Sequence, residues 1–287
     1  MDETKTHFKP SLSLIDATMI VAGSMIGSGI FIVSADITRN LGSAGWLIVV
    51  WLITGFMTIT AAVSYGELSG MYPKAGGQYI YLKEAFNPLA GFLYGWSLFA
   101  VIQTATIAAV GVAFSKFTSY LIPVVSENHI LFDAGFIKIS AAQVVAILLI
   151  IFLTYTNTKG IKGGKIIQTT FTTAKILSLF GLIIFGFLLV KNNFWSANWQ
   201  TGFHAMQTKA TTDAAVTTWQ PLNLNVILGA VAVSMVGSIF SSDAWNNVTF
   251  IAGEIKNPQR NIGLSLFLGT LIVTIIYVSA NLMYLYV

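Results

Sequence analysis

The sequence has 287 residues, of which 55% are hydrophobic and only 9% carry a charge. Soluble domains carry about 25% charged residues, so this composition, with a mean hydropathy of +0.75, excludes an ordinary soluble protein and indicates an integral membrane protein. The formal net charge of +4 falls mostly between apolar stretches, which is typical of membrane orientation and does not favour nucleic-acid binding. The chain has no cysteine, which excludes disulfide and thiolate chemistry.

Seven apolar stretches are long enough to span a membrane as helices. They run over Leu14–Ile37, Gly45–Met71, Leu89–Ile122, Ile139–Thr156, Ile166–Val190, Asn225–Ile251 and Leu264–Val287. We therefore expect an all-α integral membrane protein with about seven transmembrane helices, surrounded by membrane lipid. The odd number of spans and the apolar end of the sequence lead us to expect a sequence truncated from a longer protein.

The basic residues between the spans predict the orientation of the chain. If the N-terminus is cytoplasmic, nine Lys and Arg residues fall on the inner side and five on the outer side, which agrees with the positive-inside rule. The inner set is Lys5, Lys9, Lys74, Lys83, Lys159, Lys162, Lys165, Lys256 and Arg260, and the outer set is Arg39, Lys116, Lys138, Lys191 and Lys209. We expect a multi-pass protein of the cell (inner) membrane with residues 1–13 as a cytoplasmic tail.

Two segments between the spans have a distinctive composition. Residues 72–86 mix aromatic and charged residues, which predicts a short amphipathic helix along the inner membrane interface. Residues 191–222 are polar and contain three tryptophans, which predicts an outer-surface loop with interfacial aromatic residues.

The first span contains residues that spoil a continuous helix. Gly27 and Gly29 lack a Cβ, so we expect the helix to stop near Met25 and to restart near Gly29. The N–H groups at the start of the second half-helix, with the Ser28 hydroxyl, suit a carboxylate, and the freed Met25 carbonyl suits an ammonium group. The Gly23–Gly27 spacing has an alternative interpretation, in which the glycines only let another helix pack closely.

The sixth span is interrupted in a corresponding way. Ser241 and Asp243 break an otherwise apolar stretch, and unpaired backbone groups in a membrane are tolerated only against protein or a water-filled cavity. We expect Asp243 to be the N-cap of a half-helix that starts at Ala244, with direct contact to a cationic substrate as the alternative. The freed carbonyls of Phe240 and Asp243 suit a substrate amine, and the Phe240 ring suits either a gate over the substrate or ordinary packing.

Lys175 lies deep within the fifth predicted span. It is the tenth residue from Ile166, roughly 14 Å from the inner end at 1.5 Å per residue, whereas a lysine stem reaches about 6 Å. An intramembrane charge is a functional residue by default. We expect its ammonium group either to pair with the carbonyls of the first break, as a bound Na⁺ would, or to titrate. In a third interpretation the span begins later along the chain.

The sequence contains no catalytic constellation, and we expect neither an enzyme nor a bound cofactor or metal ion. The three histidines, His7, His129 and His204, share no metal-ligand spacing. There is no phosphate-binding glycine loop and no nucleophile elbow.

Three motifs resemble the amino acid–polyamine–organocation superfamily, especially its L-type amino acid transporter and bacterial amino acid permease branches. The first is GSMIGSGIF over residues 23–31. The second is YGEL over residues 65–68 with YPKAGG over residues 72–77. The third is FSSDAWNN over residues 240–247, which runs on to GEIKNPQRN over residues 253–261. The resemblance covers nearly the whole chain.

The resemblance implies a leucine-transporter-type fold of two inverted five-helix repeats, of which only part is present. The first repeat would cover residues 14–190, an extracellular loop residues 191–224, and the start of the second repeat residues 225–287. Further C-terminal helices of a parent permease would be needed for transport.

The resemblance also implies the site residues. They are Ser28 and Gly29 at the substrate carboxylate and the carbonyls of Met25, Phe240 and Asp243 at the amine. Gly27 and Ser241, in the two breaks, complete the expected substrate-binding set. Lys175 would replace a sodium ion. The expected function is secondary transport of neutral amino acids, with a cationic amino acid or polyamine carrier and a non-transporting amino acid sensor as alternatives; the oligomeric state is left open.

Overall fold

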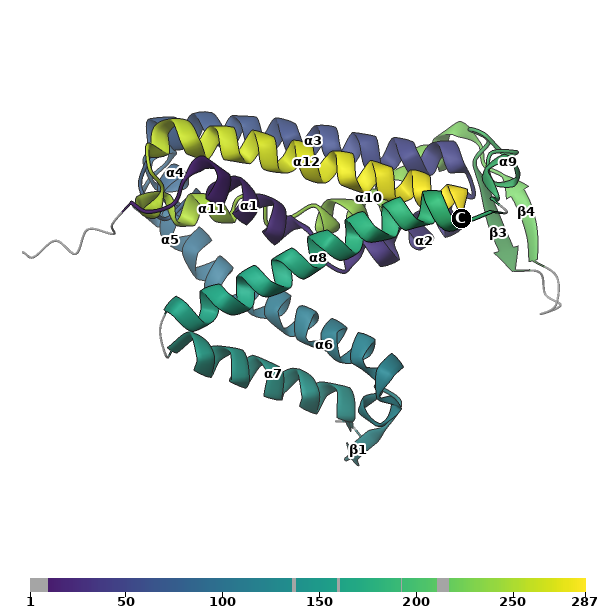
Figure 1. Ribbon diagram of the computed structural model, residues 1–287, viewed down its shortest axis with the longest axis horizontal. Coiled ribbons are helices and arrows are strands. Elements are labelled where there is room, and N and C mark those ends of the chain that lie inside the picture. Colours follow the sequence, from purple (N-terminus) through teal and green to yellow (C-terminus); the bar gives the residue numbers. More distant parts are fainter. Residues whose placement is uncertain (1–9, 136–137, 159–160, 192, 211–216) are drawn as a thin grey trace, which may run out of the picture. The chain divides into compact units, whose positions relative to one another are not determined.

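The computed structural model describes residues 10–135, 138–158, 161–191, 193–210 and 217–287. Residues 1–9 of the predicted cytoplasmic tail lie outside these ranges. Three of the basic residues expected on the inner side, Lys5, Lys9 and Lys159, therefore lie outside the described residues as well. The chain forms two compact units, the first made of Met1–Tyr81 with Ala174–Val287 and the second of Leu82–Thr173 (Figure 1).

Helices dominate both units, with two small hairpins beside them. The elements of the first unit are α1 (Leu14–Met25), α2 (Gly29–Leu41), α3 (Ala44–Met71), α9 (Trp195–Asn198), β3 (Met206–Ala210), β4 (Thr217–Pro221), α10 (Leu224–Ser241), α11 (Asn247–Phe250), a 3₁₀ turn (Ala252–Glu254) and α12 (Pro258–Tyr286). The helices α4 (Gln78–Ala85) and α8 (Ile161–Leu189) run from one unit into the other.

The prediction of seven spans is confirmed. Six helices of the described residues are long and apolar enough to cross a membrane, and α1 with α2 makes a seventh when this pair, bent by 46° at its break, counts as one span. Helix α4 also forms where the sequence predicts a short helix within residues 72–86.

Several predicted boundaries are wrong. The fourth span was expected from Ile139, but Lys138–Ser140 form strand β2, and α7 covers Ala141–Thr158. The seventh span was expected from Leu264, but α12 begins at Pro258, because proline fits the first turn of a helix and the polar residues after it continue that turn. Hydropathy reveals only the apolar part of such a helix.

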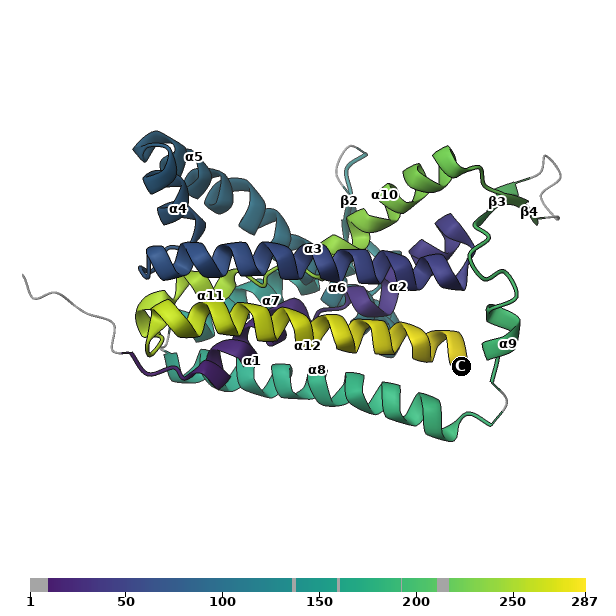
Figure 2. The ribbon, with the colours of Figure 1, turned by 90° about the horizontal axis from the view of Figure 1, so that it is seen from above.

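The core of the first unit forms where α3 and α12 lie side by side (Figure 1, Figure 2). Small residues let the two backbones approach, since a Cβ on Gly66 would lie 3.0 Å from the Gly263 Cα atom. Close packing of this kind replaces the hydrophobic effect as the force between helices in lipid. Trp51 of α3 and Tyr277 of α12 are among the largest fully buried side chains, and their rings meet edge to face at 5.2 Å.

The segment that leads into α10 contains more regular structure than the sequence predicts. Residues 191–222 were expected to form a polar loop, but they contain α9 and the antiparallel hairpin of β3 and β4. This segment is bonded to the turn between α2 and α3: Ser43 Oγ donates to the Gly202 carbonyl at 2.6 Å, and Trp46 Nε1 donates to the Phe203 carbonyl at 2.9 Å. These contacts depend on residues far apart in sequence.

The second unit consists mainly of helices, with a short hairpin before its α7. Its elements are α5 (Pro88–Ser97), a π-helical turn (Leu98–Ile102), α6 (Gln103–Leu121), a 3₁₀ turn (Pro123–Val125), β1 (Ile130–Asp133), β2 and α7. Helix α7 packs on α6 at Gly111, where an added Cβ would lie 3.4 Å from the Ala146 Cβ atom.

Candidate functional site

The first predicted break is present where the sequence placed it. Helix α1 ends at Met25, α2 begins at Gly29, and Ile26 between them has an extended backbone (φ −70°, ψ 106°). Ser28 precedes α2 without a side-chain cap hydrogen bond, and Ser28 and Gly27 are both exposed. The Phe31 N–H donates to the Ser28 carbonyl at 3.1 Å, so the N–H groups of Gly29 and Ile30, with the Ser28 hydroxyl, are the donors that this end offers to an anion.

Lys175 of α8 reaches the other side of the first break. Its Nζ atom donates to the Gly23 carbonyl at 3.0 Å and to the Ile26 carbonyl at 2.7 Å. Helix α8 begins at Ile161, but the part of it that qualifies as a membrane span among the described residues is Thr170–Leu189, so the interpretation that the span starts later than Ile166 is not contradicted. The ammonium group of Lys175 therefore pairs with two main-chain carbonyls at the end of α1, as one interpretation of the sequence predicts.

The second break lies between α10 and α11. Helix α10 ends at Ser241, and the Ser242 N–H donates to the carbonyls of Ser238 at 3.1 Å and Ile239 at 3.0 Å. Ala244 then adopts a left-handed conformation with φ +66°, which is uncommon for a residue with a Cβ and costs of order 1–3 kcal/mol. Backbone strain of this kind concentrates at functional sites.

Two predictions about the second break are wrong. Asp243 is not the N-cap of the following half-helix, because the left-handed Ala244 delays the restart to Asn247, where Asn246 takes the cap position. The Phe240 carbonyl is not left without a partner, because it accepts from the Asp243 N–H at 3.3 Å. The Asp243 side chain is exposed beside the break, and the Phe240 side chain is 63% exposed.

The two breaks touch each other. Gly29 packs on Ser241, because a Cβ added to Gly29 would lie 2.7 Å from the Ser241 Cβ atom and 3.2 Å from its Cα atom. The Tyr277 hydroxyl of α12 lies within hydrogen-bond distance of both segments, with its oxygen 3.0 Å from the Met25 carbonyl and 3.1 Å from the Ser241 carbonyl. One hydroxyl proton serves one of these acceptors at a time.

The hydrogen bond from Tyr277 changes the role predicted for the Met25 carbonyl. The Met25 carbonyl was expected to be left free for an ammonium group, but it already accepts from Tyr277. A carbonyl oxygen has two lone pairs and can accept a second hydrogen bond, so its proposed contact with a substrate is still available. Tyr277 was not among the predicted site residues; the available signal was a tyrosine within an apolar span, whose hydroxyl usually finds a partner when buried.

We expect Gly29→Ala to lower stability much more than Gly27→Ala. The added methyl group at residue 29 would overlap Ser241, and overpacking of this kind costs typically 1–3 kcal/mol, whereas a Cβ at residue 27 would meet only the Met25 carbonyl at 4.0 Å. Thermal unfolding of both variants in lipid nanodiscs measures this difference. Equal transition temperatures would show that the breaks do not depend on close contact at Gly29.

Tyr277→Phe is expected to destabilise the site, and Tyr284→Phe is its matched control on the same helix. The first variant removes the hydroxyl between two main-chain carbonyls, with an expected cost of about 1–3 kcal/mol. The second removes a buried hydroxyl that has no hydrogen-bond partner among the described residues, so its stability should change little. Similar unfolding temperatures for the two variants would contradict the bridging role of Tyr277.

An aromatic cluster packs beside the second break. The Tyr65 ring meets the rings of Trp245 at 5.0 Å and Tyr81 at 5.8 Å, both edge to face. The Tyr81 hydroxyl is 2.7 Å from Ser69 Oγ, and burial raises the pKa of this tyrosine, so it stays neutral at physiological pH. The second motif therefore packs on the third through Tyr65 of α3 and Trp245.

The predicted site residues of the two breaks thus come together within the first unit, with Lys175 bonded to the first break. Within the part of the chain that the structure describes, no group of three or more His, Asp or Glu side chains could hold a metal ion.

Comparisons with known proteins cover the whole described chain. A family model described as amino acid permease matches residues 12–287. The large neutral amino acids transporter small subunit 2 of Homo sapiens is 30% identical over 277 residues, which cover 96% of this chain and 47% of the relative. The b(0,+)-type amino acid transporter 1 of Mus musculus is 28% identical over 292 residues, which cover 99% of this chain and 54% of the relative. The chain spans about half the length of these relatives.

Proposed function

Because the chain belongs to the amino acid permease family, we propose that it binds an amino acid between its two helix breaks, and that the complete transporter moves this substrate across a membrane by alternating access. The observation that carries the proposal is the contact between the two interrupted helices at Gly29 and Ser241. Main chain that has left helical geometry inside a bilayer is tolerated where it lines a cavity or is covered by protein, which fits a binding site for a polar ligand.

The chemistry of the two breaks suits both poles of an amino acid. The substrate carboxylate would accept from the N–H groups at Gly29 and from the Ser28 hydroxyl, at the positive end of the α2 dipole. The ammonium group would donate to the second lone pair of the Met25 carbonyl and to carbonyls near Asp243. A zwitterion thereby satisfies donors and acceptors together without leaving a net charge in the membrane.

We propose a neutral amino acid as the substrate. The described relatives include a transporter of large neutral amino acids, which supports this choice. A cationic substrate is the second candidate, because Asp243 caps no helix and its exposed carboxylate lies beside the break. Competition of labelled leucine binding by arginine or a diamine separates the two, since only a site that uses Asp243 should favour the added positive charge. Phe240 would close over the bound side chain as a gate.

Lys175 would take the place of a sodium ion at the first break. Its ammonium group already donates to two carbonyls there, so substrate binding should not need Na⁺. This favours exchange, facilitated diffusion or proton coupling over sodium symport. We further propose that the N-terminus lies in the cytoplasm of a cell whose inner membrane holds the protein, that residues 14–190 form the first repeat, and that residues 225–287 begin the second.

The binding of radiolabelled leucine to the chain in lipid nanodiscs tests the proposal. We expect saturable binding that unlabelled neutral amino acids displace, with the same affinity in sodium chloride and in choline chloride. The absence of saturable binding for every standard amino acid would overturn it. Counterflow in proteoliposomes of the complete transporter then distinguishes a carrier from a sensor, which would bind the amino acid without flux.

A further inference from the structure

The two residues before the N-cap of α1 pair with the loop that follows the second break. Leu12 forms a parallel β-bridge with Ile255. The N–H groups of Ser11 and Leu12 donate to the Glu254 carbonyl at 2.8 and 2.9 Å. The Lys256 N–H donates to the Leu12 carbonyl at 2.9 Å. We call residues 11–12 together with residues 254–256 the latch, because three main-chain hydrogen bonds join these two distant segments.

An apolar contact accompanies the hydrogen bonds of the latch. The Ile255 side chain is 0% exposed and belongs to the core of the first unit, and Leu12 packs against the same core. Opening the latch therefore exposes apolar surface to water as well as breaking main-chain hydrogen bonds. Both costs favour the closed arrangement.

The latch is attached directly to α1. Ser13 follows Leu12 and is the N-cap of α1, and it forms a capping box with Asp16. The Ser13 N–H donates to the Asp16 carboxylate at 2.9 Å, and the Asp16 N–H donates to Ser13 Oγ at 3.3 Å. The regular structure of α1 thus begins at the residue after the latch, so α1 can move as a rigid helix only if the latch opens.

The other segment of the latch is held between α11 and α12. The 3₁₀ turn Ala252–Glu254 follows α11 after one residue, and Asn257 is the N-cap of α12. Asn261 Nδ2 donates to the Lys256 carbonyl at 2.5 Å. These residues belong to the stretch GEIKNPQRN of the third motif, which the proposed amino acid site does not use. The latch therefore joins α1, before the first break, to α11, after the second, and these helices lie side by side (Figure 1, Figure 2).

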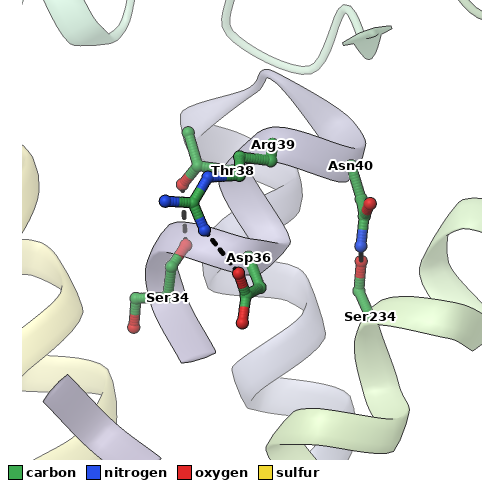
Figure 3. A network of polar contacts seen from close by, with 6 residues as sticks. All are labelled: Ser34, Asp36, Thr38, Arg39, Asn40 and Ser234. Carbon is green, nitrogen blue, oxygen red and sulfur yellow. Dashed lines mark hydrogen bonds and ion pairs between the residues drawn. The ribbon is translucent and has the colours of Figure 1, made fainter. Parts of the chain in front are cut away.

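The half-helices on the other side of the breaks are joined by side chains. Asn40 of α2 donates to Ser234 of α10 at 3.3 Å, as Figure 3 shows. Gly237 of α10 packs on Val33 of α2, where an added Cβ would lie 3.1 Å from the valine Cγ1 atom. Side chains adjust to small movements by changing rotamer, whereas the main-chain bonds of the latch break only when its two segments separate. The latch is thus an all-or-none contact.

We propose that the latch couples the two broken spans at this end of the bundle. When it is closed, it keeps α1 beside α11. When it opens, α1 and the loop after α11 separate in one step, which gives access to the two breaks from this end. The role of this step in transport rests on the proposed function, whereas the opening itself is a property of the chain without substrate.

EPR distance measurements on the chain in lipid nanodiscs test the latch. The chain has no cysteine, so Ile15→Cys on α1 and Lys256→Cys on the loop, both at exposed residues, carry the two spin labels. We expect one distance in the labelled parent and a second, longer distance when Leu12→Pro removes an N–H that donates to Glu254. Leu12→Ala, which keeps this N–H, is the control and should keep the single distance.

A second variant guards against a local effect of the proline at residue 12. Ser11→Pro, at an exposed residue, removes the other N–H that donates to Glu254 and should give the same two distances, with less of the longer one. A single unchanged distance in both proline variants, or a continuous spread in place of two populations, would overturn the proposal.

Hydrogen exchange tests the coupling across the latch. In Leu12→Pro, with no spin label, the Lys256 amide should exchange at least about tenfold faster, because its acceptor, the carbonyl of residue 12, moves away. The Asn261 amide, which donates to the Asn257 carbonyl at 2.9 Å in the first turn of α12, should not change. Unchanged exchange at Lys256 would contradict the coupling. Neither measurement involves a substrate, so a failure of leucine binding bears on the proposed function alone.

Discussion

Ser28→Trp abolishes amino acid binding while the protein remains folded, according to the site proposed here. The indole would occupy the space in front of the α2 N-terminus, where the substrate carboxylate is expected to accept from main-chain N–H groups and the hydroxyl. Hydrogen bonds to a charged group are worth about 1.5–3 kcal/mol each, so the loss of two weakens binding by at least about 100-fold. Leucine binding to the chain in nanodiscs measures the effect.

Two features of Ser28 make this variant informative. Its side chain is exposed and makes no cap hydrogen bond, so the unfolding temperature of Ser28→Trp should stay close to that of the parent. Ser28→Ala is the matched control, because it removes only the hydroxyl and should weaken binding about tenfold to 100-fold. Unchanged leucine affinity in the tryptophan variant would remove the first break from the binding site.

Lys175→Met is expected to lower leucine affinity about tenfold to 100-fold. The variant leaves the Gly23 and Ile26 carbonyls without their charged donor, and a charge-assisted hydrogen bond is worth about 1.5–3 kcal/mol. The carbonyls at the end of α1 would then find other partners, and the break would lose the geometry that holds the substrate. Affinity is the informative measurement, because removal of an intramembrane charge also makes insertion more favourable by about 2.5–3.5 kcal/mol.

The control for Lys175→Met is a substitution of Lys191, an exposed lysine just after the end of α8. Lys191→Met also removes one positive charge, but no carbonyl of either break depends on it, so leucine affinity should not change. Equal affinities for the parent and Lys175→Met would contradict the role of this ammonium group at the first break.

Much of the site follows from local sequence. Glycines at residues 27 and 29 predicted where α1 stops and α2 starts, because the absence of a Cβ acts on the backbone of those same residues. The position of Lys175 followed from its depth in the membrane, since an ammonium group in lipid must find carbonyls and the first break supplies them.

The errors arise where distant parts of the chain decide the conformation. Tyr277 lies 252 positions from Met25, so nothing near either residue indicates their hydrogen bond. Aspartate is a residue type that favours the N-cap position, but the left-handed backbone of Ala244 after Asp243 moves the start of α11 to Asn247. The segment before the hairpin of β3 and β4 is bonded at Gly202 to Ser43 in the turn after α2, a contact that the polarity of residues 191–222 does not reveal.

The distance between a bound substrate and the Gly29 amide tests the central claim most directly. With ¹³C′-serine and ¹⁵N-glycine labelling, two Ser-Gly pairs are selected, Ser28–Gly29 and Ser69–Gly70, and the second, in α3, serves as the internal control. These labels assign the two amide resonances, and the distance is measured on a second sample in which ¹⁵N-glycine is the only protein label. In that sample, rotational-echo double-resonance NMR with leucine labelled at its carboxyl carbon should place that carbon within about 4 Å of the Gly29 nitrogen, as a hydrogen bond requires, and leave Gly70 unaffected. Saturating leucine without any dephasing at Gly29 would contradict the claim that the unwound main chain binds the carboxylate.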